Sequence, residues 1–275
     1  MSDPTPALSS FLPTAVRGRG VVGRAGDGEL GECLEAYAER ILDGEVSGIL
    51  KQTDRRLVFR DGDHVVKVVF LGTLHRKRKW RRYGFSEARN LEHAARLGLV
   101  VPGVFAQGRV RRRFDPLVAS LLVIEHLAGR SSLSSQLAIA GDHVQRRRVL
   151  DRVAGVLVDL LRTGCFHVDV GPDNVFLPCH GSRVISPAVI DLEYAEFVVP
   201  GQVSQLARQS SRLARYCRRD WPELDYCRWF DGVLESARVV CGIDVSACER
   251  ARSEFASQLE RSSLSRESAD LFRAA

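Results

Sequence analysis

The most informative stretch of this 275-residue chain is Phe166-His-Val-Asp-Val-Gly-Pro-Asp-Asn-Val-Phe-Leu177. It places His167, Asp169 and Asn174 in the order H-x-D-x-x-x-x-N, after a helix-forming segment and before an apolar run. Phosphoryl transfer needs such groups, because a carboxylate orients the attacking hydroxyl while carboxylate and amide oxygens hold magnesium against phosphates. Taken alone, the central Gly-Pro-Asp-Asn is equally typical of a turn that joins two strands, so the flanking sequence has to decide.

Two flanking features favour the chemical interpretation. Downstream, the strand-like run Ala188-Val-Ile190 ends in Asp191, which supplies a further carboxylate. Upstream, Lys67 is the lone lysine of the apolar run from His64 to Phe70, in a chain whose cations are mostly arginines. A lysine in this position can simply extend from a sheet edge into water, or it can face an anionic ligand.

The distribution of apolar residues predicts an α+β protein of two lobes with a cleft between them. Residues 1–28 are rich in Pro, Ser and Gly without a clear period, which predicts a flexible N-terminal extension. Residues 29–125 are predicted to form a small β-rich N-lobe with a tight turn at Asp61-Gly-Asp63, and residues 126–275 a mainly helical C-lobe. The predicted strands cover residues 46–50, 57–60, 64–70, 100–107 and 117–125, and the predicted helices include residues 30–44, 86–97 and 143–162.

In order and spacing, these features resemble the catalytic loop and metal-binding segment of the protein-kinase-like superfamily. Within it, the chain is most similar to the bacterial lipopolysaccharide core kinases, which phosphorylate 3-deoxy-D-manno-octulosonic acid or heptose. The resemblance covers about residues 44–219. It rests at family level on Glu87-Ala-Arg-Asn-Leu91, Gly98-Leu-Val-Val-Pro102, Val123-Ile-Glu-His-Leu-Ala-Gly129, Val189-Ile-Asp-Leu-Glu193 and an arginine-rich continuation to Arg219.

This resemblance implies a kinase that uses ATP and Mg²⁺ to phosphorylate a sugar hydroxyl of the lipopolysaccharide inner core or a lipid A precursor. Asp169 would orient the acceptor hydroxyl, and His167 would brace the loop without reacting. Asn174 and Asp191 would bind magnesium.

The resemblance also implies a nucleotide-binding set in the N-lobe. Lys67 would hold the α and β phosphates, with Glu87 as its ion partner and Glu92 as the alternative on the same predicted helix. Glu125 and Leu127 lie in the hinge-like segment that would present backbone groups to adenine.

Some positions depart from the superfamily pattern. Lys51-Gln-Thr-Asp-Arg55 stands where a glycine-rich phosphate loop would lie, and Gly171 replaces the lysine that protein serine/threonine kinases carry two residues after the aspartate. No Ala-Pro-Glu segment follows Asp191. These departures argue against a regulated protein kinase and favour a small-molecule or glycolipid acceptor.

The charge distribution adds a possible partner surface. The net charge is +6 and the sequence pI is about 9.1, which is compatible with anionic partners but selects none. The stretch His75-Arg-Lys-Arg-Lys-Trp-Arg-Arg82 is either a solvated charged face or a contact for an anionic membrane surface, with Trp80 at headgroup depth. Weaker basic clusters occur at Arg109 to Arg113 and at Arg146 to Arg148.

The start of the sequence lacks a secretory signal, and no apolar run is long enough to span a bilayer. The expected location is therefore the cytoplasm, with peripheral contact at the inner face of the inner membrane, and no nucleic-acid partner is expected.

Three alternatives remain open at this stage. A soluble phosphotransferase for aminoglycosides or choline shares the same motif, and a pseudokinase scaffold would share the fold, although the intact set of site residues speaks against the latter. A zinc site is the weakest alternative, because Cys165, His167, Asp169 and the pair Cys179-His180 match no standard ligand spacing.

Overall fold

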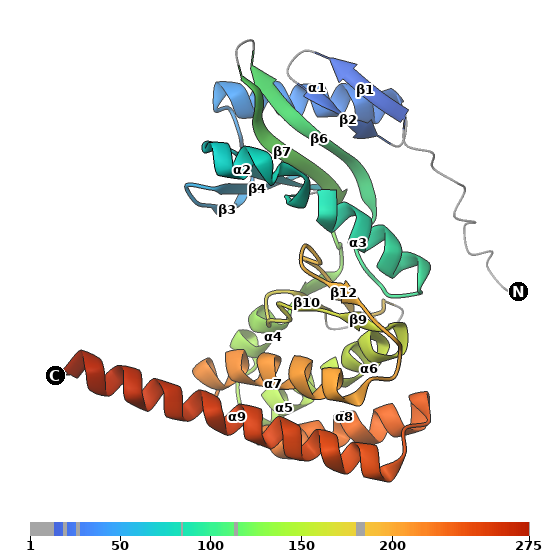
Figure 1. Ribbon diagram of the computed structural model, residues 1–275, viewed down its shortest axis with the longest axis vertical. Helices are drawn as coiled ribbons and strands as arrows, with labels where there is room; N and C mark the ends of the chain where they lie inside the picture. Colours follow the sequence, from blue (N-terminus) through green and yellow to red (C-terminus); the bar gives the residue numbers. More distant parts are fainter. Residues whose placement is uncertain are drawn as a thin grey trace, which may run out of the picture. The chain divides into compact units, whose positions relative to one another are not determined.

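The computed structural model (Figure 1) describes residues 14–18, 21–25, 28–83, 85–112, 115–179 and 185–274. The chain divides into two compact units. A sheet unit comprises Met1–Arg89 and Gly103–His126, and a helical unit comprises Asn90–Pro102 and Leu127–Ala275. The division differs from the predicted one in grouping Asn90–Pro102 with the helical unit, where the backbone N–H of Val189 donates to the carbonyl of Val100 (3.1 Å).

The sheet unit is built on a seven-stranded antiparallel sheet with the strand order β1-β2-β6-β7-β5-β4-β3. Its β5 has the bounds that the sequence predicts, and the tight turn before it is confirmed by Gly62, whose φ is +58°. The strands are β1 (Thr14–Gly18), β2 (Val21–Ala25), β3 (Ile49–Gln52), β4 (Arg56–Asp61), β5 (His64–Phe70), β6 (Val104–Arg112) and β7 (Asp115–Glu125).

The first two strands correct a sequence-based prediction. The predicted flexible extension over residues 1–28 is wrong for Thr14–Gly18 and Val21–Ala25, two antiparallel strands that continue the sheet beyond β6. Backbone pairing with β6, a strand far along the chain, holds these short glycine-containing strands, so local periodicity gives no indication of them. Residues 1–13 lie outside the described residues.

One face of the sheet is covered by α1 (Gly28–Asp43), which lies beside it in Figure 1. Leu34, Tyr37 and Ala38 of this helix are buried against strand residues that include Phe59 and Val66. Burial of such large apolar side chains contributes about 1.5–3 kcal/mol each. The same unit contains α2 (Leu74–Arg78) and the short 3₁₀ helix η1 (Trp80–Arg82), and α3 runs from Phe85 to Arg96.

The helical unit has small sheets and a layer of packed helices. The predicted helix over residues 143–162 is in fact two helices, α5 (His143–Asp151) and α6 (Val153–Thr163), which meet at Arg152. Gly164 ends α6 in the left-handed conformation (φ +66°), and a Cβ there would lie 2.1 Å from the carbonyl oxygen of Val198, so only glycine fits.

The core of this unit lies where α6 packs against α7 (Val203–Asp220) and α8 (Tyr226–Cys241), and α9 (Val245–Ala274) lies along α7 and α8 (Figure 1). Trp229 and Phe255 are almost wholly buried, and the indole N–H of Trp229 donates to the carbonyl of Leu150 (3.1 Å). In the described part of the chain, no helix has the length and apolarity needed to cross a membrane. The remaining elements are β8 (Arg130–Ser132), α4 (Leu133–Ile139), β9 (Cys165–Phe166), β10 (Val175–Pro178), β11 (Ala188–Val189) and β12 (Glu196–Phe197).

Candidate active site

Lys67 and Glu87 form a buried ion pair in the sheet unit. Side chains alternate along β5, so Val66 and Val68 enter the core beneath α1 while Lys67 projects from the opposite face. Its Nζ lies 2.5 Å from Oε1 of Glu87, and the two side chains are 18% and 5% exposed. Glu87 stands in the first turn of α3, where the helix dipole favours a negative charge. Glu92, the alternative partner on the same helix, is exposed.

The hinge-like residues lie at the end of β7. The backbone N–H of Glu125 donates to the carbonyl of Gly103 (2.8 Å), and its carboxylate accepts from the N–H of Gly103 (3.0 Å). These two bonds clamp the start of β6 to the end of β7. Leu127 begins the second part of the helical unit and is buried, and its carbonyl accepts from the N–H of Arg130 (3.3 Å).

His167 connects the H-x-D loop to the segment that ends in Asp191. Its Nε2 lies 2.9 Å from the carbonyl oxygen of Ile190, and because that oxygen can only accept, Nε2 carries the proton. The side chain is 1% exposed, and burial lowers the pKa of His167 against the opposing effects of the Ile190 hydrogen bond and the charges of Asp191 and Asp169. A neutral, buried imidazole tied to a backbone carbonyl is suited to bracing the loop.

Asp169 and Asn174 stand at the two ends of the loop and are joined by a hydrogen bond. The amide Nδ2 of Asn174 donates to the backbone carbonyl of Asp169 (2.9 Å), and the N–H of Asn174 donates to the carbonyl of Gly171 (3.0 Å). Since Nδ2 of Asn174 is the donor in this bond, the amide oxygen is the side-chain atom that can accept a hydrogen bond or ligate a cation. The Asp169 side chain is exposed.

Asp191 is held close to Asn174 in an unusual backbone conformation. The N–H of Ile190 donates to the carbonyl of Asn174 (3.0 Å), which brings the residue before Asp191 against the loop. Among the described residues, Asp191 is the only non-glycine residue with a positive φ (+61°). Such a conformation costs on the order of 1–3 kcal/mol and is typical of functional sites. The structure therefore gathers His167, Asp169, Asn174 and Asp191 within the helical unit.

Several residues that support this loop were not found by sequence reasoning. Gln209 on α7 accepts a hydrogen bond from the backbone N–H of His167 (2.8 Å), and Tyr216 on the same helix donates to the Asp169 carboxylate. Asn90 on α3 donates to the carbonyls of Leu192 (2.7 Å) and Ala195 (3.3 Å), just after Asp191. These are ordinary polar residues in helical segments, and no short motif marks them.

The zinc alternative finds no support in the geometry. The described residues contain no group of three or more His, Cys, Asp or Glu side chains arranged to hold a metal ion. Cys165 is buried, and burial raises the pKa of its thiol to about 12. His180, a further residue of this alternative, lies outside the described residues.

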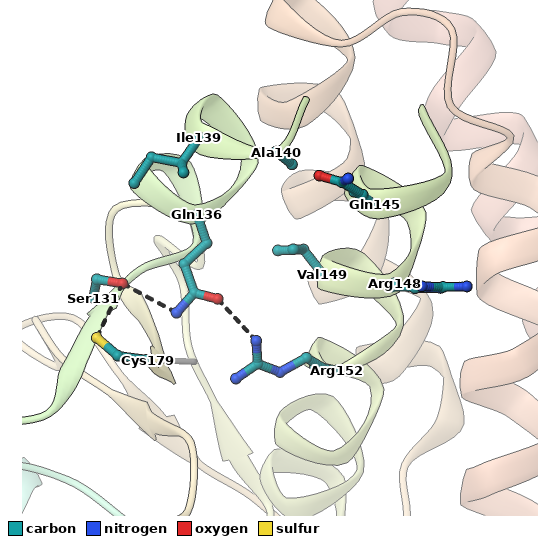
Figure 2. Close-up of a pocket in the computed structure, with 9 residues that line it drawn as sticks. All are labelled: Ser131, Gln136, Ile139, Ala140, Gln145, Arg148, Val149, Arg152 and Cys179. Atoms are coloured by element: carbon teal, nitrogen blue, oxygen red, sulfur yellow. Dashed lines mark hydrogen bonds between the residues drawn. The ribbon is translucent and has the colours of Figure 1, made fainter. Parts of the chain in front are cut away.

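A cavity of about 480 Å³ opens elsewhere in the helical unit (Figure 2). Arg152 extends into it towards Gln136 and donates to the Gln136 amide oxygen (2.9 Å), while Arg148 points away. None of the predicted site residues lines this cavity, so it is separate from the candidate active site. Its lining consists of Ser131, Gln136, Ile139, Ala140, Gln145, Arg148, Val149, Arg152 and Cys179.

The basic stretch lies on α2 and η1, and several of its cations are exposed, including Arg78, Lys79 and Arg81. Trp80 makes an edge-to-face contact with Phe85 (4.9 Å between ring centroids), and the guanidinium of Arg109 lies 5.3 Å from its ring centroid. The indole is thus packed within the unit. The side chain of Arg82 and the whole of Arg113 lie outside the described residues.

The chain has the architecture of a protein-kinase-like phosphotransferase. A unit built on an antiparallel sheet contains a lysine–glutamate ion pair. A mainly helical unit contains an H-x-D-x-x-x-x-N loop that is hydrogen-bonded to the residue before an aspartate. The family model described as "Lipopolysaccharide kinase (Kdo/WaaP) family" matches residues 62–232, which is more than half of the chain. The protein belongs to this family. It is a kinase that transfers a phosphoryl group to a sugar hydroxyl of the lipopolysaccharide core.

Solved structures that the comparison finds similar to this chain include one described as WaaP in complex with acyl carrier protein. It has a TM-score of 0.49 and 18% identity, over 81% of this chain and 92% of that chain. A crystal structure of monomeric WbdD has a TM-score of 0.46 and 20% identity, over 73% of this chain and 44% of that chain. A structure of the bifunctional kinase-methyltransferase WbdD has a TM-score of 0.43 and 18% identity, over 73% of this chain and 47% of that one. The chain thus spans less than half of these two WbdD chains.

No curated protein sequence matches the chain significantly. The solved structures share only 18–20% sequence identity with this chain, so the assignment to the family rests on the family model.

Proposed function

We propose that the kinase uses ATP with Mg²⁺ and phosphorylates a hydroxyl of the lipopolysaccharide inner core or a lipid A precursor. The observation that carries this proposal is the pair of hydrogen bonds that joins the H-x-D loop to Ile190, the residue before Asp191. His167 donates to the carbonyl of Ile190, and the N–H of Ile190 donates to the carbonyl of Asn174. Two carboxylates and an amide oxygen are thereby kept in one small region of the helical unit, as phosphoryl transfer requires.

The residues at this place fit a magnesium ion. Mg²⁺ prefers oxygen ligands and is usually bound by one or two protein side chains together with substrate phosphates and water. Asn174 offers its amide oxygen, because its Nδ2 is already hydrogen-bonded, and Asp191 offers a carboxylate held by a strained backbone. The ion would neutralise charge that develops on the phosphates.

Asp169 serves the acceptor in this proposal. Its exposed carboxylate would accept a hydrogen bond from the sugar hydroxyl and draw off the proton as the oxygen attacks. His167 is buried, burial lowers its pKa, and its Nε2–H donates to the carbonyl of Ile190. Its role is to keep Asp169 and Asp191 on a common backbone frame.

Lys67 would bind the α and β phosphates, and Glu87 would hold its ammonium in place. The pair is buried and short, so the lysine has little rotational freedom, and a fixed charge stabilises a phosphate without reorganisation. Glu125 and Leu127 would offer backbone groups to adenine. The N–H of Glu125 is already bonded to Gly103, so its carbonyl is the group left for the base.

The basic stretch supports contact with an anionic membrane surface. Arg78 at the end of α2, Lys79 between the two helices and Arg81 on η1 are exposed neighbours. Each cation near an anionic leaflet contributes about 1 kcal/mol. The acceptor belongs to a membrane lipid, so such contact would raise its local concentration. We place the enzyme in the cytoplasm, peripherally at the inner face of the inner membrane.

A nucleotide titration tests the metal assignment. Asp191→Asn should weaken the thermal stabilisation by Mg·ATP, because a carboxylate ligand loses its charge. Asp231→Asn on α8 makes the same charge change at an exposed ion pair and should leave the stabilisation unaltered. Equal stabilisation of wild type and Asp191→Asn would exclude the proposed role.

The acceptor can be identified in cells. Mass spectrometry of lipopolysaccharide from a strain that lacks this protein should show loss of one phosphate from the inner core, and complementation should restore it. An unchanged phosphate pattern would reject the inner core as the acceptor.

A further inference from the structure

One face of α7 contacts the catalytic loop at two points. The amide oxygen of Gln209 accepts from the backbone N–H of His167 (2.8 Å), and the hydroxyl of Tyr216 donates to Oδ1 of Asp169 (3.3 Å). Gln209 and Tyr216 are about two helical turns apart, so they project from the same side of α7. Gln209 fixes the backbone of the loop, whereas Tyr216 contacts the carboxylate that is proposed to meet the acceptor.

The ring of Tyr216 occupies space that the loop leaves open at Gly171. A Cβ added to Gly171 would lie 3.6 Å from Cδ2 and 3.7 Å from Cε2 of the ring, which is ordinary contact. Any side chain longer than a methyl group at this position would compete with the ring for the same volume. The glycine that departs from the protein-kinase pattern and the tyrosine on α7 are therefore complementary.

Tyr216 contributes little to the core of the helical unit. Its side chain is among the exposed large ones, at 39%, while Leu213, Ala214 and Cys217 on α7 are fully buried and make the packing contacts. An exposed tyrosine whose hydroxyl reaches the proposed catalytic carboxylate has a chemical explanation that packing does not supply.

We propose that Tyr216 is a positioning residue for phosphoryl transfer. By donating to Oδ1 it fixes the rotation of the Asp169 carboxylate, so that Oδ2 is the oxygen presented to the acceptor hydroxyl. The donor is uncharged, so the negative charge of Asp169 remains available to the hydroxyl proton. This inference rests on the proposed function, in which Asp169 orients the acceptor.

Steady-state kinetics of Tyr216→Phe test it, because this substitution removes only the hydroxyl. The lost hydrogen bond is one to a charged group, so kcat should fall about tenfold. KM for ATP and the unfolding temperature should stay unchanged. Tyr226→Phe is the matched control in the same unit. Its buried hydroxyl donates to the carbonyl of Trp221 (2.9 Å), so its loss should lower the unfolding temperature and leave kcat unchanged below unfolding.

A double-mutant cycle with Asp169→Asn decides whether the effect acts through Asp169. The double variant should be no slower than Asp169→Asn alone, because a positioning residue has no effect once its target has lost its function. Additive losses would overturn the proposal, as would a Tyr216→Phe variant with wild-type kcat. Either result with an Asp169→Asn variant that is slowed but still measurable leaves the proposed function standing, whereas full turnover by Asp169→Asn would reject the function itself.

Discussion

The two groups of site residues are held in different ways. Lys67 and Glu87 stand on regular elements, a strand and the first turn of a helix, and one short ion pair joins them. The H-x-D loop has little regular structure of its own, and its residues are fixed by hydrogen bonds to carbonyls and by side chains from α7. A site on regular elements is thus specified by local pattern, whereas a site on a loop depends on supports that are distant in sequence.

The largest effects should follow from breaking the ion pair. Lys67→Met should reduce turnover by about 10²–10³-fold, because a fixed cation near the phosphates is lost. It should also lower the free energy of unfolding by about 3 kcal/mol, since Glu87 becomes a buried charge without its cation.

The double variant Lys67→Met/Glu87→Leu separates these two effects. An apolar pair of similar volume should restore most of the stability but none of the activity. Denaturant unfolding and kinetics on the same preparations provide both readouts. Recovery of turnover in the double variant would show that the lysine acts only through the fold.

Breaking the loop at His167 should have a smaller effect. His167→Phe keeps the ring volume but leaves the part-buried carbonyl of Ile190 without its donor, which should cost about 1–3 kcal/mol of unfolding free energy.

The pH dependence sharpens this test. Burial lowers the pKa of His167 below its ordinary value of 6.5, so below that pH the unfolded chain binds a proton that the folded chain does not. The stability that His167 contributes is therefore present above about pH 6.5 and is lost as the pH falls towards the folded pKa. Unfolding measured at about pH 7.5 and about pH 5 should show a smaller loss for His167→Phe than for wild type. Equal losses would mean that His167 is not the neutral group described here.

The contrast between the two groups also explains which parts of the site could be predicted from the sequence. The apolar pattern predicts the strand that contains Lys67 and the helix that Glu87 begins, whereas the pairing of these two residues was implied by the family resemblance. The H-x-D-x-x-x-x-N spacing indicates which side chains to expect in the loop. Gln209, Tyr216 and Asn90 could not be predicted, because each acts across a long sequence separation from an ordinary helix position. The strands β1 and β2 could not be predicted for a similar reason, since β2 pairs with the distant strand β6.

Substitutions in the basic stretch, which belongs to neither group of site residues, should have the smallest effect on turnover. The triple variant Arg78→Gln/Lys79→Gln/Arg81→Gln should lose salt-sensitive binding to acidic vesicles, because surface attraction is screened beyond about 8 Å at physiological salt. Turnover on a short, water-soluble acceptor should stay at the wild-type level. Cosedimentation across a salt series measures the binding.

A matched control removes the same net charge from exposed positions of the helical unit, with Arg228→Gln/Arg250→Gln/Arg261→Gln. This control should keep its vesicle binding. Equal loss in both triple variants would show that only net charge matters, and absence of wild-type binding at low salt would identify the stretch as a solvated surface.

The most direct test of the central claim is phosphoryl transfer from Mg·ATP to deacylated lipopolysaccharide core by wild type and Asp169→Asn. The wild type should phosphorylate the oligosaccharide, and the variant should be slower by at least about 100-fold because the group that accepts the hydroxyl proton is lost. Thermal stabilisation by Mg·ATP should be the same for both proteins, because Asp169 acts on the acceptor. A variant that keeps most of its turnover would contradict the account.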